Sequence, residues 1–208
     1  MKIDEPDTDE VTRDLIQAFP AAPGDLSGLH ERLAAAAQRD GILDVAYRTI
    51  DSPVGSLLLA ATEQGLIRVA YAREGHDAVL QTLAVRISPR ILHAPGRLEA
   101  AARELGEYFN GQRRRFDLPL DLRLSAGFRR TVLSYLPEIG YGRTASYTAV
   151  AQLAGHPKAV RAVGTACATN PLPVVVPCHR VVRSDGQMGG YLGGPEAKRA
   201  LLSLEAAA

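Results

Sequence analysis

The chain has 208 residues, of which 46% are hydrophobic and 23% charged, and this ordinary globular balance excludes a disordered or collagen-like chain. Its two cysteines cannot form a disulfide framework, and no apolar run reaches the roughly 20 residues that span a bilayer. Because the first ten residues are acidic and lack an apolar core, we expect no signal peptide and a cytoplasmic protein.

The net charge of +1 conceals an asymmetry along the chain. Residues 1–40 hold four basic and nine acidic residues, residues 41–120 hold ten and nine, and residues 121–208 hold ten and five. A basic C-terminal half is compatible with nucleic-acid binding. Many solvated surfaces carry the same excess, so the charge alone does not decide the partner.

Residues 1–40 read as an acidic helical extension. Two segments there have helical spacing, VTRDLIQAF and GLHERLAAAAQ, and PAAPGD separates them. Neither segment contains a group of residues that would support catalysis.

Residues 41–122 are predicted to form an α/β domain. Residues 45–72 favour two or three antiparallel strands, with turns at Asp51-Ser52-Pro53 and Glu63-Gln64-Gly65. Residues 97–110 are predicted to be an amphipathic helix that Gly111 ends. We place the domain boundary within residues 117–126, which leaves residues 123–208 as a second domain.

The second domain is predicted to be mainly helical. A first helix covers residues 126–136 and stops at Pro137, a second covers 147–154 with Ser146 as its cap, and a third covers 158–168. The short Gly-containing turn between the second and third suggests a helix-turn-helix, although ordinary helical hairpins share this pattern.

The third helix is rich in small residues: Ala159, Ala162, Gly164, Ala166 and Ala168. Arg161 is its only long side chain after Lys158. Such a helix either packs closely against a neighbour or approaches a narrow target. The DNA minor groove, about 6 Å wide, is one such target.

The segment NPLPVVVPCHRVV contains the strongest chemical signal. Val174–Val176 are predicted to form a short buried strand that Pro177 ends, which would present Cys178 at the strand end. An isolated cysteine is usually a buried structural thiol, but the adjacent His179 favours a reactive thiolate. Cys167 lacks such neighbours and is predicted to be a core residue.

PCHRVV, with NPLPVV before it and GGYLGGPEAKRALLSLE after it, resembles the O6-alkylguanine-DNA alkyltransferase family, also called methylated-DNA–protein-cysteine methyltransferases. YFNGQRRRFDLPLDL and GRTASYTAVAQLAGHPKAVRAVG are also similar to that family, and the resemblance covers roughly residues 45–205. It implies a ribonuclease-H-like α/β N-terminal domain, followed by a mainly helical domain with a winged-helix-like helix-turn-helix.

The resemblance implies DNA repair by alkyl transfer in a single suicidal turnover. Cys178 matches the acceptor of the alkyl group. His179 matches the residue that takes the thiol proton through a water, and Glu205 matches the carboxylate that orients and charge-balances this histidine. Double-stranded DNA containing O6-alkylguanine is the implied partner, bound by a monomer through the minor groove.

The alkylated base must leave the stack to reach a buried thiol. Arg161 matches the finger that fills the vacated space, Tyr147 the residue that crowds the 3′ phosphate, and Asn170 the hinge before the cysteine segment. The other residues that the resemblance places at the DNA or the base are Ala162, Gly164, Val181, Tyr191 and Leu192. Lys198 matches a supporting lysine near the pocket.

The sequence departs from some relatives. It contains no Trp, and no cysteine precedes Cys167, so the zinc site of some N-terminal domains is expected to be absent. We expect no metal and no cofactor. Leu192 occupies a position where relatives vary, so the sequence does not determine the width of the pocket.

Two other function classes remain as alternatives. A non-catalytic DNA-lesion binder could use the same fold, but such binders replace the acceptor cysteine that Cys178 matches. A cysteine hydrolase could use Cys178, His179 and Glu205, but it would leave Arg161 and the small-residue helix unexplained.

Overall fold

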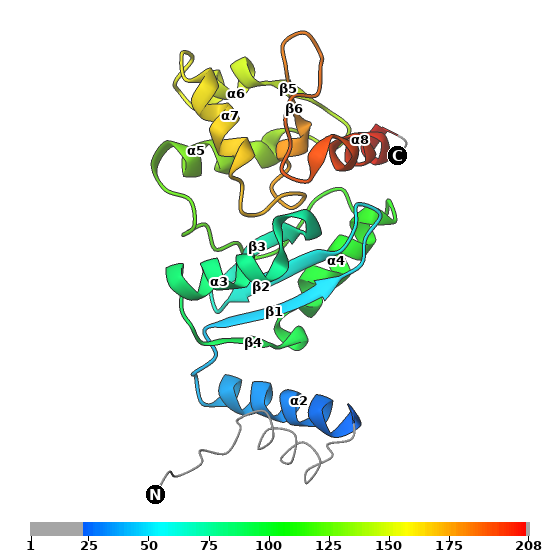
Figure 1. Cartoon of the computed structure of the whole chain (residues 1–208). Coiled ribbons are helices and arrows are strands. Elements are labelled where there is room, and N and C mark those ends of the chain that lie inside the picture. The colour runs from blue at the N-terminus through cyan, green and yellow to red at the C-terminus, as the bar shows by residue number, and fades with distance from the viewer. Residues whose placement is uncertain (1–22, 207–208) are drawn as a thin grey trace, which may run out of the picture.

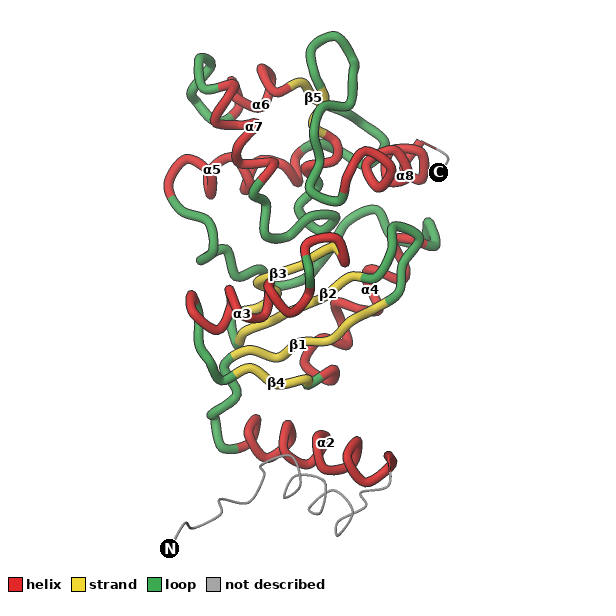
Figure 2. Tube along the Cα trace, viewed as in Figure 1, coloured by secondary structure: helices red, strands yellow, loops and turns green. Residues whose placement is uncertain are grey.

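The computed structural model of the protein describes residues 23–206. An N-terminal helix, a sheet with helices against it, and a group of helices follow one another along the molecule (Figures 1 and 2). The sheet has four strands in the order β3-β2-β1-β4, and a pair of two-residue strands, β5 and β6, lies among the C-terminal helices.

The first three strands form an antiparallel meander: β1 (Val45–Ile50), β2 (Leu57–Thr62) and β3 (Gly65–Tyr71). Both predicted turns are confirmed, except that Gly65, the last residue predicted for the second turn, is the first residue of β3. A fourth strand that the sequence did not reveal, β4 (Ile91–His93), pairs in parallel with β1.

Two helices cover opposite faces of the sheet. Successive side chains of β2 point to opposite faces of the sheet. Leu58 and Ala60 pack on one face with residues of α3 (His76–Arg86), and Leu57, Leu59 and Ala61 belong to the larger core on the other face, which includes residues of α4 (Glu99–Phe109). A short 3₁₀ helix, η1 (Ala72–Glu74), follows β3, and another, η2 (Pro95–Leu98), leads into α4. The helix predicted over 97–110 is therefore η2 and α4, and Gly111 follows it with φ of 72°.

The extension contributes α2 (Pro23–Arg39), which contains the predicted GLHERLAAAAQ segment and lies beside β4 (Figure 1). Ala34 and Ala37 are its buried residues in the core. The predicted VTRDLIQAF helix lies outside the described residues.

The C-terminal part comprises α5 (Gly127–Tyr135), η3 (Leu136–Glu138), α6 (Tyr147–Leu153), α7 (Val160–Ala168), η4 (Cys178–Arg180) and α8 (Gly194–Ala206). The Ser146 hydroxyl accepts a hydrogen bond from the backbone N–H of Ala149 at 3.1 Å, which confirms the predicted cap of α6. Helix α7 begins at Val160, two residues later than predicted, because residues 157–158 form a turn. Strands β5 (Ala145–Ser146) and β6 (Val181–Val182) pair in parallel beside these helices.

The predicted strand at Val174–Val176 is wrong. These valines lie in a turn, where the N–H of Val176 donates to the carbonyl of Leu172 at 2.8 Å and Val174 has φ of 73°. Three prolines in the segment, Pro171, Pro173 and Pro177, lack the N–H that a strand ladder needs. The three valines are nevertheless buried, because the turn itself lies in the core.

The outer edge of β3 joins the two halves of the chain. Leu66 exchanges backbone hydrogen bonds with the connecting segment, accepting from Asp121 and donating to Pro119. Further along the strand, the N–H of Val69 donates to the carbonyl of Pro171 at 2.9 Å. The sheet therefore directly supports the turn that leads to Cys178.

Candidate active site

The thiol of Cys178 lies at the start of η4 and is held by Asn170. The Asn170 amide donates from Nδ2 to the Cys178 sulfur at 3.1 Å and to the Val176 carbonyl at 2.9 Å. Its Oδ1 accepts from the N–H of Leu172 at 3.0 Å. One buried side chain thus closes the turn by bonding to the backbone, as expected of the hinge asparagine that the resemblance implies. Its contact with the thiol was not predicted.

Burial raises the pKa of the Cys178 thiol to about 11, although the hydrogen bond from Asn170 and the charge of Lys198 act in the opposite direction. Only 2% of the residue is exposed. At neutral pH the resting group is therefore a thiol, and a nucleophilic thiolate requires a base that removes its proton.

The neighbouring His179 is fully buried, and its Nε2 lies 2.8 Å from Oε1 of Glu205 on α8. Burial acts to raise the pKa of the Glu205 carboxyl, but hydrogen bonds and charges from His179 and Arg180 lower it to about 2. Since the carboxylate only accepts, we assign the imidazole proton to Nε2.

This tautomer leaves a lone pair on Nδ1 of His179. Nδ1 is buried and has no hydrogen-bond partner within residues 23–206. Burial lowers the pKa of His179, while Glu205 raises it, and the balance is below the ordinary value. The ring is therefore neutral at neutral pH and can accept a proton at Nδ1.

The sequence analysis missed two further partners of Glu205. Arg180 donates from Nε to Oε2 and from Nη2 to Oε1, both at 2.9 Å, and from Nη1 to the Ile139 carbonyl at 2.6 Å. Tyr108, from α4, donates its hydroxyl to Oε1 at 2.8 Å. The position of Arg180 within an apolar run was a usable signal, because a buried guanidinium requires a carboxylate. No local sequence pattern indicated a role for Tyr108 in the site.

An open pocket of about 530 Å³ lies beside this group. Its lining residues are Arg73, Glu74, Tyr147, Gly164, Ala168, Gly190, Tyr191 and Leu192. The Tyr191 ring stands edge-on to that of His179, with centroids 6.3 Å apart. Gly189 has φ of 65°, and a Cβ there would lie 2.9 Å from the Tyr147 hydroxyl, so the loop needs glycine where it meets α6.

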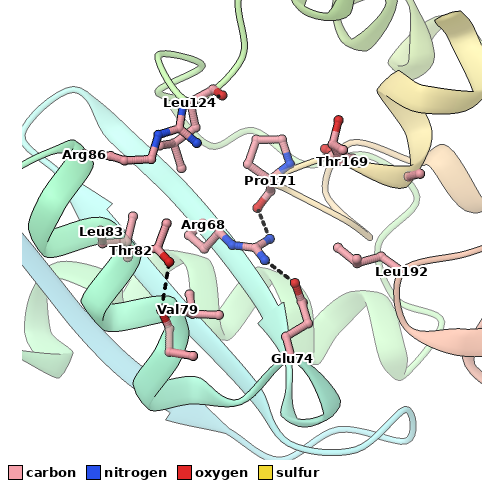
Figure 3. A pocket seen from close by; sticks show the side chains of 13 residues that line it. Arg68, Glu74, Val79, Thr82, Leu83, Arg86, Leu124, Thr169, Pro171 and Leu192 are labelled. Carbon is pink, nitrogen blue, oxygen red and sulfur yellow. Dashed lines mark hydrogen bonds and ion pairs between the residues drawn. The ribbon is translucent and has the colours of Figure 1, made fainter.

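Four of the predicted substrate residues, Tyr147, Gly164, Tyr191 and Leu192, line this pocket together. Asn170 instead lines a cavity of about 380 Å³ between α3 and the Thr169–Pro171 turn, which Leu192 also borders (Figure 3). Val181 is fully buried, and its carbonyl accepts a hydrogen bond from Lys198 Nζ at 2.6 Å. Neither Cys178 nor Val181 is a lining residue of the open pocket.

Helix α7 presents small residues to an open surface. Its buried side consists of Val163, Ala166 and Cys167, whereas Ala162 and Gly164 are half-exposed. A Cβ on Gly164 would meet nothing within 4 Å. Arg161 is exposed on the first turn of this helix and forms no ion pair in the described part of the chain. Close packing therefore does not explain Gly164.

Lys198 lies buried on α8 and contacts the first residue of the loop 188–193, called the pocket loop below. Its amine donates to the carbonyls of Val181 and Met188, and burial lowers its pKa. The lysine thus connects β6 with the residues that precede Gly189.

Within residues 23–206, no cluster of three or more His, Cys, Asp or Glu side chains could hold a metal ion. None of the helices described there has the length and hydrophobicity needed to cross a membrane.

Comparison with known proteins agrees with the fold. Residues 45–122 match the family model "6-O-methylguanine DNA methyltransferase, ribonuclease-like domain", and residues 127–207 match the "DNA binding domain" of the same family. The predicted fold class, a ribonuclease-like α/β domain followed by a helical DNA-binding domain, is therefore confirmed.

Individual relatives cover the same region. A methylated-DNA–protein-cysteine methyltransferase of Mycobacterium tuberculosis is 41% identical over 167 residues, covering 77% of this chain and 92% of the relative. The constitutive enzyme of Bacillus subtilis is 36% identical over 163 residues, covering 76% and 94%. The crystal structure of Mycobacterium tuberculosis OGT in complex with DNA superposes with a TM-score of 0.69 at 40% identity, covering 78% and 93%.

Proposed function

Because the chain belongs to the 6-O-methylguanine DNA methyltransferase family, we propose that it repairs DNA by transferring the alkyl group of O6-alkylguanine to its own Cys178. The observation that supports this most strongly is the buried hydrogen bond between Glu205 and His179, the residue that follows Cys178 in the chain. It gives the imidazole a defined proton on one nitrogen and a lone pair on the other.

His179 activates the thiol. Its Nδ1 accepts the Cys178 proton through a water molecule, and Glu205 stabilises the imidazolium that forms. The pKa of Glu205, near 2, keeps its negative charge throughout the neutral range. Arg180 and Tyr108 position this carboxylate by their hydrogen bonds to it.

The thiolate then attacks the alkyl carbon in line with the bond to O6. A carbon–sulfur bond forms, the carbon–oxygen bond breaks, and its electron pair goes to the guanine, which takes up a proton. The product thioether does not return to a thiol, so each chain acts once. No cofactor is needed for this balance of atoms and charge.

DNA binds as a duplex through its minor groove, along α7, and the monomer is the working unit. The exposed small residues of this helix fit a narrow groove, and its single long cation, Arg161, can enter the stack that the flipped base leaves. Tyr147 and Tyr191 line the pocket that receives the base. Because phosphate contacts supply the affinity, we expect little sequence preference.

Replacing Arg161 by alanine should slow repair of a lesion in duplex DNA more than reaction with free O6-alkylguanine. Only the duplex requires a side chain to fill the vacated stack, and unstacking a base costs a few kcal/mol. Single-turnover rates on both substrates test this, with Arg129→Ala on α5 as a control. Equal losses on the two substrates would assign Arg161 a structural role instead.

Deleting residues 1–40 should preserve stoichiometric repair. The extension is acidic and lies outside the matched regions, and its helix α2 lies on the far side of the sheet from α7 (Figure 1). Since Ala34 and Ala37 are buried in the core, we expect a fall in melting temperature of about 2–4 °C, which corresponds to about 1 kcal/mol. A folded truncation that no longer repairs would make residues 1–40 part of the active unit, against the proposed domains at 41–122 and 123–208.

One experiment separates the three function classes. The protein is incubated with duplex DNA containing a single O6-methylguanine, and its intact mass is followed with increasing DNA. A transferase gains one methyl group and stops at one equivalent. A lesion binder gains nothing while still retaining the DNA, and a hydrolase instead releases product repeatedly from an ester or amide without a stable gain in mass.

A further inference from the structure

The pocket loop is held by a tyrosine from the N-terminal sheet. Tyr71, the last residue of β3, lies with its hydroxyl 2.8 Å from the hydroxyl of Tyr191, and the two rings stand edge to face with centroids 5.8 Å apart. Tyr71 is only 2% exposed. One of the two phenols donates and the other accepts, so each polar group is satisfied by the other domain.

The ring of Tyr71 also packs against Gly193, two residues after Tyr191. A Cβ on Gly193 would lie 2.6–2.8 Å from three carbon atoms of the Tyr71 ring. The ring therefore occupies the space that any side chain at this position would need. Together the hydroxyl contact and this packing hold the loop on both sides of Leu192.

Tyr71 is itself held by polar contacts that reach the reactive thiol. Its N–H donates to Glu74 Oε1 at 2.8 Å, and Glu74 pairs with Arg68 through its other oxygen. Arg68 also donates from Nη1 to the Pro171 carbonyl at 3.1 Å, as Figure 3 shows. Pro171 directly follows Asn170, whose amide contacts Cys178.

We propose that Tyr71 is a positioning residue that acts through Tyr191 to set the width of the open pocket, and so the size of the alkyl group that it admits. The inference rests on the proposed function, because it assigns a specificity role within that site. Tyr191 lines the open pocket and faces His179, so a hydrogen bond that restrains its hydroxyl restrains the pocket wall. A restrained wall favours a small group such as methyl over a large one such as benzyl.

The test compares two duplexes of one sequence, one with a single O6-methylguanine and one with a single O6-benzylguanine. Tyr71→Phe removes the hydroxyl and keeps the ring over Gly193. We expect the ratio of the benzyl to the methyl rate constant to rise about five-fold, the factor that corresponds to one net hydrogen bond. Tyr47→Phe on β1 is the matched control, because the ring of Tyr47 packs against His93 instead of the loop.

Tyr191→Phe removes the same hydrogen bond from its other side and serves if Tyr71→Phe does not fold. The double variant should show the same ratio as Tyr191→Phe alone, because both changes break one interaction. An unchanged ratio in Tyr71→Phe, or additive effects in the double variant, would overturn the role of Tyr71. If the wild type transfers from neither duplex, the proposed function itself fails.

Discussion

A Cys178→Ser variant should accept no methyl group from O6-methylguanine DNA, yet should bind the duplex like the wild type. Serine keeps the size of the side chain, but its hydroxyl is a far weaker nucleophile than a thiol that has lost its proton. The DNA-binding surface that we propose on α7 does not include this residue. Transfer is followed by the intact mass of the protein and binding by fluorescence anisotropy of a labelled duplex.

Cys167→Ser is the matched control, since the second cysteine also lies buried in the C-terminal domain. Burial raises the pKa of Cys167 to about 12, and within the described residues no asparagine side chain donates to its thiol, as Asn170 does to Cys178. No histidine is adjacent to it in the sequence. This variant should transfer at the wild-type rate. Stoichiometric transfer by Cys178→Ser, lost on adding Cys167→Ser, would move the reaction to the other cysteine.

Replacing Glu205 by glutamine should slow transfer about 100-fold at neutral pH without abolishing it, as expected for the loss of base assistance. Glutamine keeps the shape but removes the charge that raises the pKa of His179 and that would stabilise the imidazolium. The pKa of the Cys178 thiol is about 11, so thiolate forms without help as the pH rises towards that value. The deficit should therefore shrink with increasing pH.

Single-turnover rates against pH for the two proteins provide the measurement. Glutamine leaves the Arg180 guanidinium buried without its carboxylate, so the folded fraction of the variant must be checked by circular dichroism. Tyr108→Phe is a useful comparison, because it removes one hydrogen bond to Glu205 and keeps the charge. Superimposable profiles for wild type and Glu205→Gln would exclude Glu205 from activation of the thiol.

The sequence predicted those features that local chemistry determines. The turn residues between β1, β2 and β3, the Ser146 cap of α6 and the glycine after α4 each act over a few positions. The three-residue β4 was missed because its pairing with β1 connects positions more than forty residues apart. The strand predicted at Val174–Val176 is wrong because the prolines around these hydrophobic residues lack the N–H groups of a strand ladder and favour a turn.

In the candidate site, too, the residues marked by local sequence were predicted and those placed by distant contacts were not. Cys178 and His179 are adjacent in an unusual motif, so the sequence itself marks them, and Glu205 came from the resemblance. Tyr108, Tyr71 and Arg68 belong to the N-terminal domain and reach the site only through tertiary packing. No local pattern distinguishes such residues from ordinary core or surface residues, since their role depends on what the other domain places against them.

The identity of the modified cysteine tests the central claim most directly. After reaction with one equivalent of O6-methylguanine duplex, trypsin leaves both cysteines on one peptide, residues 162–180, because no Lys or Arg lies between Arg161 and Arg180. The peptide must therefore be fragmented in the mass spectrometer. We expect a single methyl group on Cys178 and none on Cys167. A methyl group on Cys167, or an unmodified peptide from DNA that has nonetheless been repaired, would contradict the account.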